Sequence, residues 1–123
     1  MDTRSKILSL SHAQSLTGPL AIVTGTFDVL RAEHVRELEN LRQRAGAAKL
    51  LAVVLPVSAE YLTQHARSEL VAALRVIDYV VTADGAAVDR LADLLNPVEI
   101  VRLEDSDMRR ARELKEHVHR RQT

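Results

Sequence analysis

The sequence predicts a three-layer α/β domain, Rossmann-like, built on a parallel sheet of four or five strands. Short β-branched apolar runs alternate along the chain with longer amphipathic segments, at the spacing of successive βαβ units. The first of these runs breaks at Gly25, and a helical pattern begins a few residues later, as in a strand–turn–helix unit. Because crossovers between parallel strands are right-handed, helices are expected to cover both faces of the sheet.

The expected elements follow from apolar spacing, capping residues and breakers. The helices are expected at Ser9–Leu16, Ala32–Ala45, Ala59–Gln64 after the capping residue Ser58, about Arg67–Val76, and a segment after Asp84-Gly85 with the stripe Val88, Leu91, Leu94 and Leu95. The strands are expected at Leu20–Thr24, Lys49–Leu55, Asp78–Thr82 and Val98–Arg102. The tail from Ser106 has the apolar stripe of a last helix.

The composition narrows the function classes. The 123 residues are enough for one domain that buries roughly two-thirds of its unfolded surface, so we expect a single domain over 1–123 with a lead-in segment and helix at 1–18. Lys and Arg number 17, as do Asp and Glu, so no net charge attracts the chain to polyanions. The absence of cysteine excludes disulfides, thiolate nucleophiles and cysteine-based zinc sites.

The apolar and aromatic residues also bear on partners. Two Tyr and one Phe are too few for a base-stacking platform, so nucleic acid is not an expected partner. No apolar run is long enough to span a bilayer, and no N-terminal segment has the pattern of a secretion signal. We therefore expect a cytoplasmic protein that does not bind membranes.

The stretch from Thr24 to His34 carries the chemistry that the sequence predicts. Backbone N–H groups of the glycine turn and the positive end of the next helix dipole make an anion site after the first strand. The residues Gly25-Thr26-Phe27-Asp28, followed by His34, resemble the G-x-F-D-x-x-H-x-G-H signature of the nucleotidyltransferase superfamily that includes the cytidylyltransferases. Within that superfamily, the pattern resembles the nucleotidyltransferase domain of ADP-heptose synthase, and also glycerol-3-phosphate cytidylyltransferase.

Three further segments share this resemblance, which as a whole extends over most of the chain. They are Lys6–Leu10, which looks like the family's lead-in helix, Glu69–Val81, which looks like its middle helix and third strand, and Asn96–Val101, which looks like the approach to its fourth strand.

The resemblance implies a reaction and a set of site residues. In the family, a sugar or polyol phosphate attacks the α-phosphate of a nucleoside triphosphate and displaces pyrophosphate, with catalysis by positioning and charge stabilisation. The nucleotide would be CTP or ATP with Mg²⁺, and the family's dimers imply a homodimer. His34 and Arg31 would contact phosphates as catalytic residues. The residues that would bind the nucleotide are Thr24, Gly25, Thr26, Phe27, Asp28 and Arg102.

Each of these residues also has a structural interpretation. Arg31 stands where the family has its first histidine, and it is either a phosphate-binding cation or a solvated or paired arginine. His34 is either a phosphate ligand or an ordinary half-buried helix residue. Asp28 either helps to hold magnesium or substrate, or caps the next helix. The hydroxyls of Thr24 and Thr26 either face phosphate or belong to ordinary strand-end residues.

Glu33 is the departure that most opposes nucleotide binding. It stands where the family has the glycine that lets the nucleotide approach the backbone. Like charges about 4 Å apart repel by roughly 1 kcal/mol in water and about 4 kcal/mol at an effective dielectric constant of 20. The direction of this side chain therefore separates an enzyme from a catalytically inactive relative that serves as a binding or oligomerisation module.

Two other loops differ from the family pattern. Leu55-Pro56-Val57 replaces a polar turn after the second strand, and Arg102-Leu103-Glu104-Asp105 replaces a Lys-Gly-Gly-Asp sequence after the fourth. Glu104, Asp105 and Asp107 are acidic and close in sequence, which is more typical of a solvated helix start than of a cation site. We therefore expect no resident metal and a weakened catalytic function.

Overall fold

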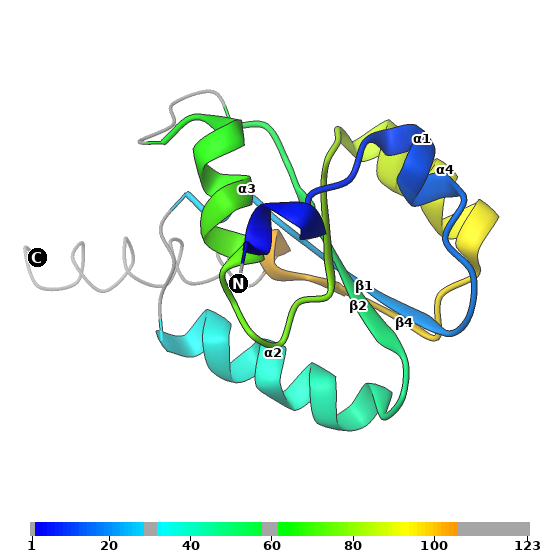
Figure 1. The fold of residues 1–123 in the computed structure, drawn as a ribbon. Coiled ribbons are helices and arrows are strands. Elements are labelled where there is room, and N and C mark those ends of the chain that lie inside the picture. The colour runs from blue at the N-terminus through cyan, green and yellow to red at the C-terminus, as the bar shows by residue number, and fades with distance from the viewer. Residues whose placement is uncertain (1, 29–31, 58–61, 106–123) are drawn as a thin grey trace, which may run out of the picture.

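The structure is a computed structural model that describes residues 2–28, 32–57 and 62–105. Its centre is a four-stranded parallel sheet with the strand order β3-β2-β1-β4 (Figure 1). The strands are β1 (Leu20–Gly25), β2 (Lys49–Val54), β3 (Tyr79–Thr82) and β4 (Glu99–Arg102). This is the Rossmann-like α/β architecture that the sequence predicts, with four strands in the described residues.

Helices cover both faces of this sheet. On one face, α2 (Ala32–Ala45) and α3 (Gln64–Ala72) bury residues such as Leu38 and Val71 against the strands. On the other face, α1 (Leu10–Gln14) and α4 (Gly85–Leu95) lie side by side (Figure 1). The sheet and its two helical coverings are the three layers of the fold.

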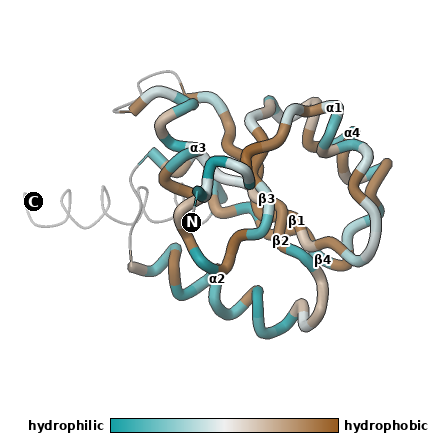
Figure 2. Tube along the Cα trace, viewed as in Figure 1, coloured by the Kyte–Doolittle hydropathy of each residue, from teal (hydrophilic) through white to brown (hydrophobic). Residues whose placement is uncertain are grey.

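The central strands are buried along their whole length, as the near-continuous apolar runs predict. Every residue of β1 is buried, and only the first residue of β2 is exposed. Hydrophobic residues are accordingly concentrated in the strands at the middle of the molecule (Figure 2). Alternate residues of β1 belong to the two cores, so Val23 packs towards α2 and α3, and Ile22 packs towards α1 and α4.

The lead-in segment covers the outer edge of β3. After the 3-10 helix η1 (Thr3–Lys6), Ile7 forms a parallel bridge with Val80. The Leu8 amide then donates to the Val80 carbonyl at 2.7 Å. The Lys6 ammonium group reaches the Leu74 carbonyl at 3.2 Å and thereby ties the same segment to the turn after α3.

Two predicted helices end earlier in the structure than in the sequence pattern. The helix expected to continue to Val76 stops at Ala72, because the chain must turn there to bury Ile77 and to bring Asp78 to the amide of Leu50. The first helix is also shorter than Ser9–Leu16, and Ser9 is its N-cap rather than its first residue. The separate helix predicted over Ala59–Gln64 is wrong in its described part, because Thr63 is the N-cap of α3, which begins at Gln64 and thus three residues before the predicted Arg67. Residues 59–61 and the predicted helix from 106 lie outside the described residues.

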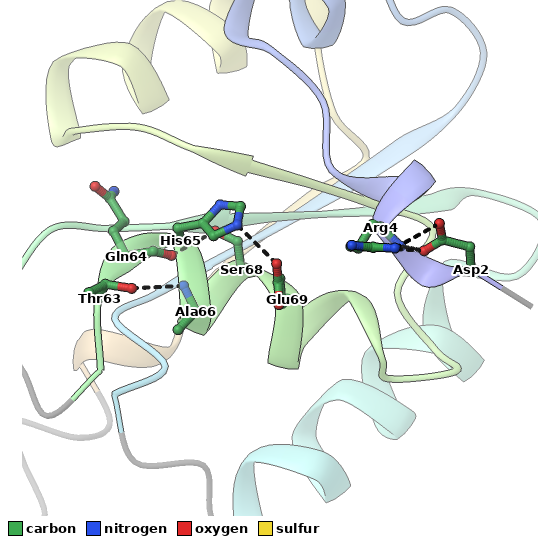
Figure 3. Close-up of polar contacts among 8 residues, drawn as sticks. All are labelled: Asp2, Arg4, Thr63, Gln64, His65, Ala66, Ser68 and Glu69. Carbon is green, nitrogen blue, oxygen red and sulfur yellow. Dashed lines mark hydrogen bonds and ion pairs between the residues drawn. The ribbon is translucent and has the colours of Figure 1, made fainter.

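Helix starts are defined by side-chain caps. The Thr63 hydroxyl accepts from the Ala66 amide at 3.1 Å and begins α3 (Figure 3). The Asp84 carboxylate accepts from the Ala87 amide at 2.8 Å and begins α4, so the predicted Asp84-Gly85 turn is a capped helix start. None of the helices in the described parts of the chain is long and apolar enough to cross a bilayer.

Candidate functional site

The carboxyl ends of the four strands form the candidate site, because ligands of open parallel sheets bind beyond these ends. We call this region the carboxyl edge; it comprises residues 24–28, 54–57, 82–84 and 102–105 together with the starts of α2 and α3. The chain runs from β1 to β2 on one side of β1, whereas β4 lies on its other side. The topological switch point therefore lies between β1 and β4.

Buried polar side chains gather at this edge. Among the described residues, the polar side chains that are buried are Thr24, His34, Arg67 and Ser68. Thr24 is next to last in β1, His34 is in the first turn of α2, and the other two are in the first half of α3. The carboxyl edge thus has a polar interior, while the sheet behind it is apolar.

The turn after β1 is closely packed. Phe27 has a φ of 54°, in the left-handed region, and its side chain is only 5% exposed. A Cβ atom on Gly25 would lie 3.2 Å from Cε2 of the Phe27 ring and 3.4 Å from Cβ of Leu103. A side chain at position 25 would therefore require the Phe27 ring of the same turn to shift by a few tenths of an ångström.

Thr24 and Glu104 meet at the switch point. The Thr24 hydroxyl donates to the Glu104 carboxylate, with both oxygens 2.8 Å away, although the residues are 80 positions apart. Glu104 follows β4, and Thr24 lies in register with Arg102 at the end of that strand. The predicted phosphate-facing hydroxyl is therefore engaged with a carboxylate in this structure.

Arg67 is the residue that sequence reasoning missed. Its guanidinium group is fully buried, with Nη1 donating to the carbonyl oxygens of Thr26 and of Leu55, the latter at 2.7 Å. Its Nε donates to the carbonyl oxygen of Leu62 at 3.2 Å. A signal was present in the sequence, because Arg67 lies four residues before the buried Val71 and hence on the same helix face.

Other polar residues of α3 complete this packing. Gln64 donates from Nε2 to the Val54 carbonyl at 2.9 Å, and the Ser68 hydroxyl donates to the Gln64 carbonyl at 2.9 Å. The Gln64–Ser68 contact is drawn in Figure 3, where Nε2 of His65 also contacts Oε1 of Glu69 along the same helix. That pair is 2.9 Å long and its side chains are exposed, so it belongs to the surface of α3.

The remaining predicted site residues occupy different environments. Asp28 accepts the Leu62 amide at 3.2 Å through Oδ1, which connects the β1–α2 turn to the chain before α3. The Thr26 side chain is half-buried, while Arg102 is exposed at the end of β4. Arg31 lies outside the described residues. Within the described residues, no group of three or more His, Asp or Glu side chains is placed to hold a metal ion.

Glu33 and His34 begin α2. His34 is 4% exposed, so it is buried rather than half-buried. Glu33 is partly buried, and its carboxylate oxygen Oε2 is shielded from solvent. The side chain that separates the two functional hypotheses is therefore not turned fully outward.

Comparison with known proteins finds a similar fold in a solved structure. No family model matches the chain, and no curated relative matches it. A solved structure is similar, namely the lipopolysaccharide core biosynthesis protein from Thermoplasma volcanium, with a TM-score of 0.59 and 20% sequence identity over 67% of this chain and 71% of that one. At this identity, the likeness shows a shared fold.

Proposed function

We propose that this chain is a nucleotidyltransferase-like protein that has lost nucleotidyl transfer and keeps the fold as a binding module. The observation that carries the proposal is the shielded carboxylate oxygen of Glu33 at the start of α2. The sequence resemblance places a glycine there, where a nucleotide would approach the backbone. A carboxylate that is not free to face solvent opposes a polyphosphate at that position by about 4 kcal/mol at 4 Å and an effective dielectric constant of 20.

The hydrogen bonds of the carboxyl edge support the same proposal. The Thr24 hydroxyl is engaged by Glu104, and the Arg67 guanidinium donates to backbone carbonyls. A phosphate at these groups would have to replace bonds that the protein already makes, and it would separate their partly buried acceptors from their donors. The edge is therefore better suited to holding its own loops together than to transferring a nucleotidyl group.

An active enzyme is the second candidate, and the position of His34 in the first turn of α2 favours it. In that case His34 and Arg31 would contact the phosphates of CTP or ATP with Mg²⁺. The residues that would hold the nucleotide are Thr24, Gly25, Thr26, Phe27, Asp28 and Arg102. The acceptor would be a sugar or polyol phosphate, and the protein would act as a homodimer.

Thermal unfolding with each nucleotide separates the two candidates. We expect no shift of the melting temperature with millimolar CTP, ATP, GTP or UTP, with or without Mg²⁺. A ligand present at 100 times its dissociation constant would add about 2.7 kcal/mol of stability, a shift of several degrees for a domain of this size. Such a shift, followed by pyrophosphate release with a sugar phosphate, would overturn the proposal in favour of the enzyme.

Variants at the start of α2 test the reason for the loss. We expect Arg31→His combined with Glu33→Gly to raise nucleotide affinity. Arg31→His combined with Glu33→Gln is the matched control, because it removes the charge and keeps the bulk of the side chain at position 33. If only the glycine variant binds, bulk is the obstacle; if neither binds, repulsion by Glu33 is not the cause and the loops after β2 and β4 are.

A further inference from the structure

The buried guanidinium group of Arg67 contacts segments that are separate in the sequence. It donates to the carbonyl of Thr26 in the β1–α2 turn and to the carbonyl of Leu55 directly after β2. It also donates to the carbonyl of Leu62, just before the cap of α3. One side chain from α3 therefore binds the segment that follows β1, the segment that follows β2 and the residue before the N-cap of α3.

The same segments are joined again by other hydrogen bonds. The Leu62 amide donates to Oδ1 of Asp28 at 3.2 Å, and the Leu55 amide donates to the Gly25 carbonyl at 2.9 Å. Leu62 is thus held at its amide by the β1–α2 turn and at its carbonyl by Arg67. Neither segment can shift far without breaking a bond to the other.

Phe27 makes the turn dependent on these bonds. A non-glycine residue at a φ of 54° is strained, and such strain persists only where the surrounding structure over-determines it. Arg67 donates to the carbonyl of Thr26, which belongs to the same peptide group as the Phe27 nitrogen. Because the orientation of that peptide group defines φ of Phe27, the guanidinium acts on the strained torsion itself.

We propose that Arg67 is a positioning residue that locks residues 26–28, directly after β1, to residues 62–63, directly before α3, so that these two described segments move as one unit. A ligand that displaces the residues after β1 would consequently also displace the start of α3. The proposal goes beyond the question of nucleotidyl transfer, because the coupling is a property of the folded chain without any ligand.

Nuclear magnetic resonance tests this coupling in the unaltered chain and in variants. Phe27 is the single phenylalanine of the sequence, so labelled phenylalanine reports on the turn alone. In the unaltered chain, the Leu55 and Leu62 amides are expected to exchange hydrogen with equal protection. In Arg67→Met, these two amides are expected to exchange faster by the same factor, which should be about tenfold or more when the amides of β1 serve as the reference. The ring signal of Phe27 is expected to change as well.

Matched variants distinguish positioning from core filling. Gln64→Leu removes a bond from the same helix to Val54 but none to the turn, so the Phe27 signal should stay as in the unaltered chain. Arg67→Lys keeps a cation without the planar fork, and its ring signal should fall between those of the unaltered chain and Arg67→Met.

Two results would overturn the proposal. One is a Phe27 signal that does not change in Arg67→Met while global stability falls, which would make Arg67 a core residue only. The other is unequal protection of the Leu55 and Leu62 amides in the unaltered chain. If Arg67→Met does not fold, the same comparison is decided by Arg67→Lys, where unequal acceleration of the two amides counts against coupling.

Discussion

The two ends of the sheet are held together by polar contacts of different kinds. At the amino end, Arg42 of α2 pairs with Asp78 before β3 at 2.7 Å, and the side chains are 37% and 23% exposed. Asp78 also accepts the amide of Leu50 at 2.9 Å. At the carboxyl end, Arg67 and Thr24 make comparable bonds while fully buried. The two ends therefore differ in access to water more than in the type of bond.

Because of this difference, the polar contacts at the two ends are expected to contribute unequally to stability. When a partly exposed pair breaks, water satisfies both partners, so the contact contributes little. When a fully buried donor is lost, less water can reach its carbonyl or carboxylate partner, so the loss costs more. The end of the sheet where ligands bind in related folds is the end where this chain depends most on its own polar side chains.

The largest expected effect comes from removing one arginine at each end. Arg67→Met removes the fully buried donor that the carbonyls of Thr26 and Leu55 share, and it should lower the free energy of unfolding by about 2–4 kcal/mol. Arg42→Met should lower it by about 0.5–1 kcal/mol, because the Asp78 carboxylate keeps the Leu50 amide and gains water. Urea unfolding at neutral pH measures both, and equal losses would contradict the distinction between the ends.

The next effect compares a buried threonine with an exposed one. Thr24→Val keeps the shape of the side chain and removes the hydroxyl that donates to Glu104, which should cost about 1.5–2 kcal/mol of stability. Thr82→Val, at the exposed end of β3, should change stability by less than about 0.5 kcal/mol. If both variants unfold at the same urea concentration, the Thr24–Glu104 bond has no energetic importance.

Smaller effects, opposite in sign to each other, are expected at two glycines, Gly25 at the end of β1 and Gly85 at the start of α4. Gly25→Ala places a Cβ 3.2 Å from the Phe27 ring and should destabilise the fold by about 1 kcal/mol, since the ring must shift. Gly85→Ala, at the open first position of α4, should stabilise it by about 0.5 kcal/mol. Melting temperatures that move in the same direction would show that backbone entropy outweighs packing at Gly25.

The fold could be predicted from the sequence because its signals are local. Ala32–Ala45 was predicted with the bounds that the structure has, since Leu38 and Leu41 repeat at helical spacing and Gly46 ends the pattern. The buried strands were predicted to within one residue at each end, because continuous apolar runs have few other uses in a chain of this length. The end of α3 was wrong because the burial of Ile77 depends on tertiary packing.

The site could be predicted only in outline, because its contacts are not local. The turn at Gly25–Phe27 carries a recognisable sequence, so its place beyond β1 was expected. The partner of Thr24 could not be predicted, since the sheet order brings Glu104 to it across the chain. Arg67 was missed because an arginine on a helix is usually solvated, and nothing in the sequence shows that backbone carbonyls surround it.

The smallest effect is expected for the contact between Asp2 and Arg4, which is more exposed to solvent than the contacts at either end of the sheet. Arg4 donates to Asp2 from its backbone amide at 3.0 Å and from Nε at 3.2 Å (Figure 3), and these bonds lower the pKa of the Asp2 carboxyl. A lowered pKa in the folded state means that the contribution to stability is present above about pH 4 and is lost as the pH falls. Asp2→Asn should therefore be slightly less stable than the unaltered chain at pH 7, and the gap should close towards pH 2. Acid unfolding followed by circular dichroism measures this gap, and a gap that widens in acid would contradict the assignment.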